Sequence, residues 1–125
     1  SKKRNLLFYN LLDEIISLSK EYEQYFILVE HLRIKKTIIS LKNGDEEFKE
    51  ISREMEYYWE CNRMVNKAEH YYHELKIVSD FSGRTTFQKL SSFFEKAIPE
   101  LEVYYEQTKS PLIKYHHKFL KLGLG

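Results

Sequence analysis

The chain has few of the residues that mark cross-linked, loop-rich or membrane-spanning proteins. Its 125 residues include one cysteine, two prolines and four glycines. The lone Cys61 cannot form a disulfide within the chain, which is typical of a reducing compartment. No apolar run approaches the roughly 20 residues of a transmembrane helix, and no signal-peptide pattern opens the sequence. We therefore expect a cytoplasmic protein without a transmembrane segment.

An excess of charge of either sign is also absent. Lys and Arg number 20, Asp and Glu number 19, and the net charge is +1. Proteins whose main task is to bind duplex nucleic acid usually carry a clear basic excess, so this balance argues against nucleic acid as the main partner. What is abundant is apolar sequence. The hydrophobic content of 42% is enough to build a core in a single domain that spans residues 1–125.

Residues 6–41 contain neither proline nor glycine, and their apolar residues recur at steps of three and four. This spacing places them on one face of an α-helix and predicts a single long helix with a buried main seam. The seam consists of Phe8, Leu11, Ile15, Leu18, Tyr22, Tyr25, Val29, Leu32 and Ile39. A second apolar line runs on the roughly opposite side and consists of Tyr9, Ile16, Ile27, Ile34, Ile38 and Leu41.

A helix with two apolar faces has to be enclosed between neighbours. Two other helices of the same chain, or a C-terminal segment that folds back, would enclose it. The alternative is that the second line forms an interface with a second copy of the chain or another protein. We assign that interface to Ile16, Ile27, Ile34, Ile38 and Leu41.

Turn and capping residues divide the rest of the chain. Asn43-Gly44 is typical of a helix C-terminus, and Asp45 predicts the N-cap of a second helix over about 46–78. A loop over 79–84 precedes a third helix that begins at Thr85 or Thr86, where Thr85 and Gln88 have capping-box spacing. The link at Gly44 is so short that the first two helices should be antiparallel.

Two prolines interrupt the third helical segment. The apolar pattern keeps its phase across Pro99, which predicts a kink rather than a chain reversal. Ser110-Pro111 has the chemistry of an N-cap followed by a first helical residue. The predicted fold is all-α. It is an elongated antiparallel bundle of three long helices, of which the third is kinked at Pro99 or split near Pro111, with a short fourth helix over about 111–122 in the second case.

The densest set of ionisable residues lies on the second predicted helix, over 60–74. His70 and Glu74 are four residues apart and could share a metal ion or orient the imidazole. A catalytic zinc needs three protein ligands, and the Glu-x-x-His motif of di-iron bundles is absent from the sequence. We therefore expect no metal and no cofactor. Cys61 lies on the inward stripe, where a buried structural thiol is expected.

Arg63 and His70 are separated by six residues. This spacing is similar to the Arg-x(4–6)-His motif of HEPN-type ribonucleases, which are small all-helical bundles. The resemblance implies that two such motifs meet across a dimer and that Arg63 and His70 act on the scissile phosphate. It covers eight residues of the 125, and it departs from the family pattern at Met64, where the family prefers a polar residue.

Two further stretches suggest contact with anions or acidic partners. Arg84 precedes the third predicted helix, whose free amides could hold an anion together with its guanidinium group. The C-terminal segment is a basic amphipathic stretch in which Lys114, Lys118 and Lys121 could touch a membrane surface or an acidic partner.

Together these patterns predict a non-enzymatic helical interaction module. It would form a homo-oligomer or bind a protein partner through the second apolar line, in the manner of a coiled coil. The alternatives are a metal-independent ribonuclease that uses Arg63 and His70, and a binder of anionic lipid or nucleic acid through the C-terminal lysines.

Overall fold

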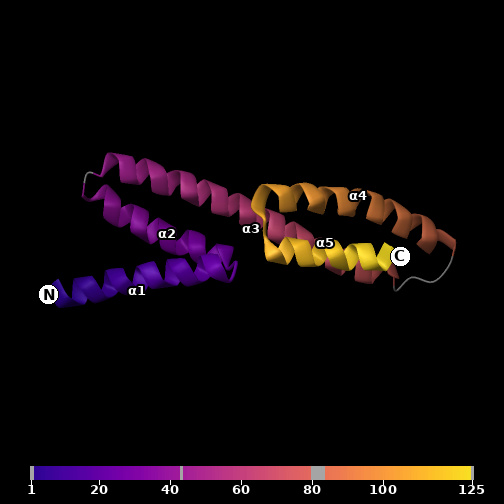
Figure 1. Cartoon of the computed structure of the whole chain (residues 1–125), viewed down its shortest axis with the longest axis horizontal. Helices are drawn as coiled ribbons and strands as arrows, with labels where there is room; N and C mark the ends of the chain where they lie inside the picture. Colours follow the sequence, from indigo (N-terminus) through magenta and orange to yellow (C-terminus); the bar gives the residue numbers. More distant parts are fainter. Residues whose placement is uncertain (1, 43, 80–83, 125) are drawn as a thin grey trace. The chain divides into compact units, whose positions relative to one another are not determined.

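The computed structural model describes residues 2–42, 44–79 and 84–124, and these residues form five α-helices and no strand. The helices are α1 (Lys2–Glu21), α2 (Tyr25–Ser40), α3 (Asp45–Ser79), α4 (Arg84–Thr108) and α5 (Pro111–Leu124) (Figure 1). The prediction of an all-α fold is confirmed. The count of three long helices is wrong, because a turn divides the first predicted helix and the last one is split before Pro111.

Contacts between residues divide the chain into two compact units, Ser1–Asn62 and Arg63–Gly125. The N-terminal unit contains α1, α2 and the first part of α3. The C-terminal unit contains the rest of α3, α4 and α5. Each unit has its own buried apolar residues, and one domain over residues 1–125 stays a prediction.

The turn between α1 and α2 is built around Glu23, whose φ of 53° lies in the left-handed region. The amide of Glu23 donates to the carbonyl of Lys20 at 3.3 Å, and the amide of Gln24 donates to the carbonyl of Ser19 at 2.9 Å. These two hydrogen bonds define a Schellman motif, which ends a helix and satisfies its last carbonyls. The left-handed position is usually glycine or asparagine, and here it is glutamate. The predicted continuous helix over 6–41 is therefore wrong.

Because the chain reverses at Glu23, α1 and α2 pack as an antiparallel hairpin (Figure 1). The buried residues are Leu12, Ile16 and Ser19 of α1 and Tyr25, Leu28, Leu32 and Ile39 of α2. The main seam is therefore buried only in its second half. Phe8, Leu11, Ile15, Leu18 and Tyr22 are exposed, because the face of α1 that meets α2 is offset from the seam by about 100° around the helix.

Three side-chain contacts give the alignment of the helices within the N-terminal unit. Lys35 Nζ lies 3.2 Å from Asp13 Oδ1, and Lys42 Nζ lies 4.9 Å from the ring centroid of Tyr9. The start of α1 is thus opposite the end of α2. Lys20 Nζ lies 2.6 Å from Glu54 Oε1 and joins α1 to α3. Exposed ion pairs of this kind stabilise a fold by little, so apolar burial has to hold the unit together.

In the C-terminal unit, α4 and α5 are antiparallel neighbours (Figure 1). The helix α4 continues through Pro99, as predicted. Its buried residues Phe93, Phe94, Ala97 and Leu101 share the core with Ile113 and Leu120 of α5 and with Met64, Val65, Ala68 and Tyr71 of α3. The buried residues of α4 recur at helical spacing, so the sequence alone indicates that they share one face of the helix.

The split before α5 confirms the second of the two predicted geometries. Lys109 has a φ of 53°, and its amide donates to the carbonyl of Tyr105 at 2.7 Å, which ends α4. Ser110 then caps α5, because its Oγ accepts a hydrogen bond from the amide of Ile113 at 3.1 Å. Pro111 is the first helical residue, where its missing N–H has no cost.

At the start of α3 the prediction was off by one residue. The helix begins at Asp45 itself, and the carbonyl of Gly44 accepts the amide of Phe48 at 2.8 Å. Asn43 and the loop residues 80–83 lie outside the described residues, as do the side chains of Thr85 and Thr86.

Candidate interaction surface

The hairpin of α1 and α2 leaves a row of large apolar side chains uncovered. We call it the hairpin surface and define it as Phe8, Leu11, Ile15 and Leu18 of α1 with Tyr22 directly after it, and Ile27, Ile34 and Ile38 of α2 with Leu41 directly after it. Phe8 is 50% exposed, Tyr22 64% and Leu41 80%. Ile38 is half-buried, and the other members are exposed.

On α1 the surface has the spacing of a coiled-coil seam. Its members follow one another at steps of three, four, three and four residues. Phe8, Ile15 and Tyr22 occupy a positions of a heptad, and Leu11 and Leu18 occupy d positions. A strict a/d stripe of this kind is the narrow seam by which one helix packs along another. In this chain the seam is turned by about 100° around the helix from the buried face that contains Leu12 and Ile16.

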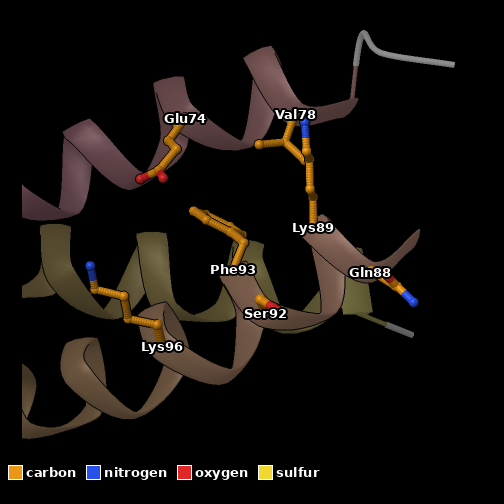
Figure 2. Close-up of a pocket in the computed structure, with 7 residues that line it drawn as sticks. All are labelled: Glu74, Val78, Gln88, Lys89, Ser92, Phe93 and Lys96. Carbon is orange, nitrogen blue, oxygen red and sulfur yellow. The ribbon is translucent and has the colours of Figure 1, made fainter. Parts of the chain in front are cut away.

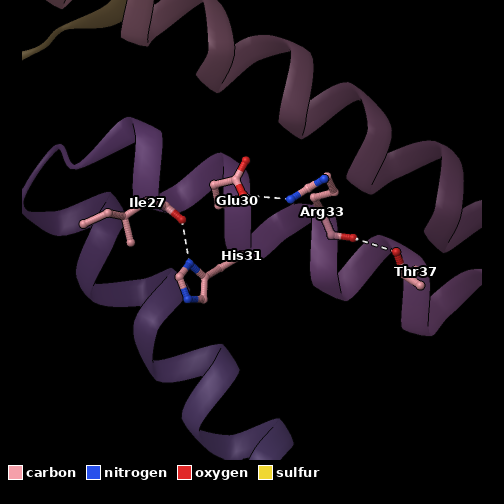
Figure 3. Close-up of polar contacts among 5 residues, drawn as sticks. All are labelled: Ile27, Glu30, His31, Arg33 and Thr37. Atoms are coloured by element: carbon pink, nitrogen blue, oxygen red, sulfur yellow. Dashed lines mark hydrogen bonds and ion pairs between the residues drawn. The ribbon is translucent and has the colours of Figure 1, made fainter.

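On α2 the surface repeats at seven residues, through Ile27, Ile34 and Leu41. Figure 3 shows Ile27 and His31 on the side of α2 that lies away from the α3 ribbon. His31 Nδ1 lies 2.7 Å from the carbonyl oxygen of Ile27, and this contact holds the ring along the helix. The charged pair of Glu30 and Arg33, at 2.8 Å, lies beside this row. The apolar row thus has a polar border.

The rows of α1 and α2 together expose a large apolar area. Taking roughly 200 Å² for a large side chain, the exposed fractions amount to about 800 Å² of apolar surface. The largest apolar patch on an ordinary monomer is roughly 300–600 Å². The two rows of the hairpin surface together expose more than this, which favours a role in protein binding.

The predicted interface residues divide accordingly. Ile27, Ile34, Ile38 and Leu41 belong to the hairpin surface. Ile16 is 6% exposed and packs inside the N-terminal unit, so it is not available to a partner. The α1 members were missed because the sequence placed them on a seam that would be buried in a longer helix. Their heptad spacing was the signal, and only the position of the turn shows that it faces outward.

Arg63 and His70 are both exposed on α3 and are held by different neighbours. Arg63 Nη1 donates to the Tyr104 hydroxyl at 3.5 Å, and its guanidinium carbon lies 5.7 Å from that ring's centroid. His70 Nε2 lies 3.7 Å from a carboxylate oxygen of Glu74. The described contacts do not join the two residues, and the ribonuclease function stays a prediction.

The carboxylate of Glu100 accepts hydrogen bonds from two tyrosine hydroxyls, one of which also contacts Arg63. The hydroxyls of Tyr71 and Tyr104 both donate to Glu100. Burial opposes the charge of Glu100, but these two hydrogen bonds, together with the nearby charges of Lys67 and Lys96, lower the pKa of the carboxyl group. Burial, and then the same contact, raises the pKa of Tyr71. These contacts link α3 to α4. Their donors and acceptors are paired, which is typical of a hydrogen-bond network that stabilises the fold.

The C-terminal lysines lie as an exposed set on α5. Lys114, Lys118 and Lys121 are all exposed, and Lys114 Nζ lies 5.7 Å from the ring centroid of Tyr105. Exposed apolar residues, among them Tyr115 and Leu122, share the helix with them. The lipid or nucleic-acid function stays a prediction, and the side chain of Arg84 lies outside the described residues.

An open hollow of about 590 Å³ lies between α3 and α4 in the C-terminal unit (Figure 2). Phe93 points from α4 into it, and Glu74 and Lys96 flank it. The remaining lining residues are Val78, Gln88, Lys89 and Ser92. The lining has no cysteine or histidine and a single carboxylate, so it does not suggest a metal site.

The described residues contain no group of three His, Cys, Asp or Glu side chains that could hold a metal ion. Burial raises the pKa of the Cys61 thiol, which lies in the core of the N-terminal unit as predicted. None of the described helices is long and apolar enough to cross a membrane.

Comparison of the chain with protein-family models, with curated proteins and with solved structures finds no match. The surfaces of the molecule itself therefore carry the functional argument.

Proposed function

We propose that the chain is a non-enzymatic protein interaction module and that the hairpin surface is its binding site. The observation that carries this proposal is the exposed a/d seam from Phe8 to Tyr22, together with a second exposed apolar row along α2. Such an area left in water costs free energy, at about 25 cal/mol per Å². A partner helix or hairpin that covered it would recover part of that cost.

The physical character of the surface supports binding to protein rather than to a small molecule. Its side chains stand on the outer faces of two helices. Small-molecule sites are concave and enclose most of the ligand. Amphipathic helices and hairpins bind one another by laying apolar residues at heptad spacing into the facing grooves.

The test compares the chain with Leu11→Glu and with Val103→Glu. Leu11 is 49% exposed at the centre of the seam, and Val103 is a 53% exposed apolar residue on α4. A purified chain that associates with itself, or that captures a protein from extract, should lose this association with Leu11→Glu and keep it with Val103→Glu. Helical content should stay close to that of the unmodified chain for both variants, and so should the unfolding midpoint at low concentration, where no partner is bound.

Two outcomes would contradict the proposal. One is an unmodified chain that stays monomeric and captures no protein. The other is a Leu11→Glu variant that unfolds at low concentration, where no partner is bound, because Leu11 would then belong to the monomer's own core.

A further inference from the structure

We infer that the partner of the hairpin surface is a second copy of this chain, packed antiparallel on it about a two-fold axis. The inference rests on the proposed function and adds the identity and direction of the partner. It rests on two observations, the outward-facing seam of α1 and the difference in charge between the two ends of the hairpin.

The area of the surface fits this partner. A specific protein interface of ordinary size buries about 800 Å² on each side, which is the apolar area the hairpin surface leaves exposed. An isologous pair needs only one such patch, because each copy presents the same residues to the other.

The side chains of the seam match when two copies run in opposite directions. In an antiparallel pair, an a position of one helix lies beside a d position of the other. Phe8 of one copy then lies beside Leu18 of the other, and Leu11 lies beside Ile15. Every layer from Phe8 to Leu18 thus pairs two apolar side chains, with no polar residue at an a or d position between them.

The charges of the hairpin select the same direction. The N-terminal end of α1 carries Lys2, Lys3 and Arg4, and its other end carries Glu21 and, in the turn, Glu23, while Lys20 is paired with Glu54 of α3. An antiparallel partner sets the basic end of one copy against the acidic turn of the other, whereas a parallel partner sets like against like. The helix dipoles add to this preference, because the N-terminus of α1 then lies near the C-terminus of its counterpart.

Disulfide cross-linking tests the direction directly. Leu7, Glu14 and Glu21 are exposed, flank the seam and stand seven residues apart. Each is changed to cysteine in a Cys61→Ala chain. In an antiparallel dimer, Glu14→Cys forms a disulfide with its own copy near the axis, and Leu7→Cys forms one with Glu21→Cys when the two are mixed. Alone, Leu7→Cys and Glu21→Cys stay uncross-linked.

Two controls distinguish the disulfides of a specific dimer from disulfides that form by random collision. Ser17→Cys lies on α1 away from the seam and is exposed, so it should give no disulfide dimer. Adding Leu11→Glu to Glu14→Cys should abolish the Glu14→Cys dimer.

Each other outcome overturns the inference. Cross-linking of all three positions with themselves means a parallel pair. A chain that sediments as a monomer at all concentrations has no second copy bound. If that monomer nevertheless captures another protein in a manner that Leu11→Glu abolishes, the proposed function stands and only the identity of the partner falls.

Discussion

At Glu23 and Lys109 the backbone enters the left-handed region with a side chain that is not glycine. An L-residue in this conformation costs roughly 1–2 kcal/mol, because its Cβ approaches the following carbonyl oxygen. Both residues end a helix and reverse the chain, so their conformation is imposed by the packing of the helices on either side. The fold therefore carries local strain at two turns that position its hairpins.

We predict that Lys109→Gly stabilises the chain. Glycine adopts the left-handed conformation without strain, and part of this gain is offset by the greater freedom of glycine in the unfolded chain. The ion pair of Lys109 with Glu106 is exposed, and its loss costs little. The free energy of unfolding, measured with urea, should rise by about 0.5–1 kcal/mol.

Lys109→Ala is the control, because it removes the same charge but keeps Cβ. It should give no increase in stability. Equal unfolding free energies for the glycine and alanine variants would show that the left-handed conformation at this position carries no strain.

At the scale of the elements, α5 packs two histidines against its neighbours. Nδ1 of His116 and Nε2 of His117 are buried and have no hydrogen-bond partner among the described residues. Burial lowers the pKa of both rings. Glu69 raises and His73 lowers the pKa of His116, and for His117 Lys121 acts with burial while Glu102 opposes it. The folded chain therefore binds fewer protons at these rings than the unfolded chain.

This predicts a loss of stability in acid. A histidine with a lowered folded-state pKa favours the folded chain above its unfolded pKa of about 6.5. That contribution disappears as the pH falls through the folded-state values. The unfolding midpoint of the unmodified chain should fall from pH 7.5 to pH 5.5, and the fall should be smaller for the His116→Gln, His117→Gln double variant. For Tyr115→Gln, an exposed change on the same helix, the unfolding midpoint should fall as much as it does for the unmodified chain. A double variant whose unfolding midpoint falls as much as that of the unmodified chain would contradict the prediction.

The elements that the sequence could predict are those with local chemical signals. Ser110-Pro111 starts α5 and Gly44 precedes α3, as capping preferences indicate. The turn at Glu23 has no such signal, because Tyr22 and Tyr25 continue the helical spacing and glutamate is not a usual left-handed residue. The reversal depends on packing of α1 against α2, which a local pattern does not contain.

The candidate surface, too, could be predicted only in part from the sequence. The α2 residues Ile27, Ile34 and Leu41 stood out because they had no place in the main seam. The α1 residues looked like core, since heptad spacing is the same whether the seam faces the protein's own helices or a partner. Only the position of the turn decides between the two.

At the scale of the whole molecule, the proposed dimer couples stability to concentration. If the folded state is a dimer, a tenfold rise in protein concentration stabilises it by about 1.4 kcal/mol per mole of dimer, because unfolding releases two chains. For two chains of 125 residues that unfold in one step this corresponds to a rise in Tm of about 2–3 °C. The Tm should therefore increase steadily over a hundredfold range of concentration, followed by circular dichroism at 222 nm.

The hairpin surface should be responsible for this dependence. Leu18→Glu places a charge at a d position that is 44% exposed in the single chain, where it disturbs the pair far more than the fold. Its Tm should be independent of concentration and close to the low-concentration value of the unmodified chain. Val103→Glu should keep the full dependence. A Tm of the unmodified chain that does not change with concentration, or a Leu18→Glu variant that keeps the dependence, would mean that the apolar seam of α1 is not where the molecule associates.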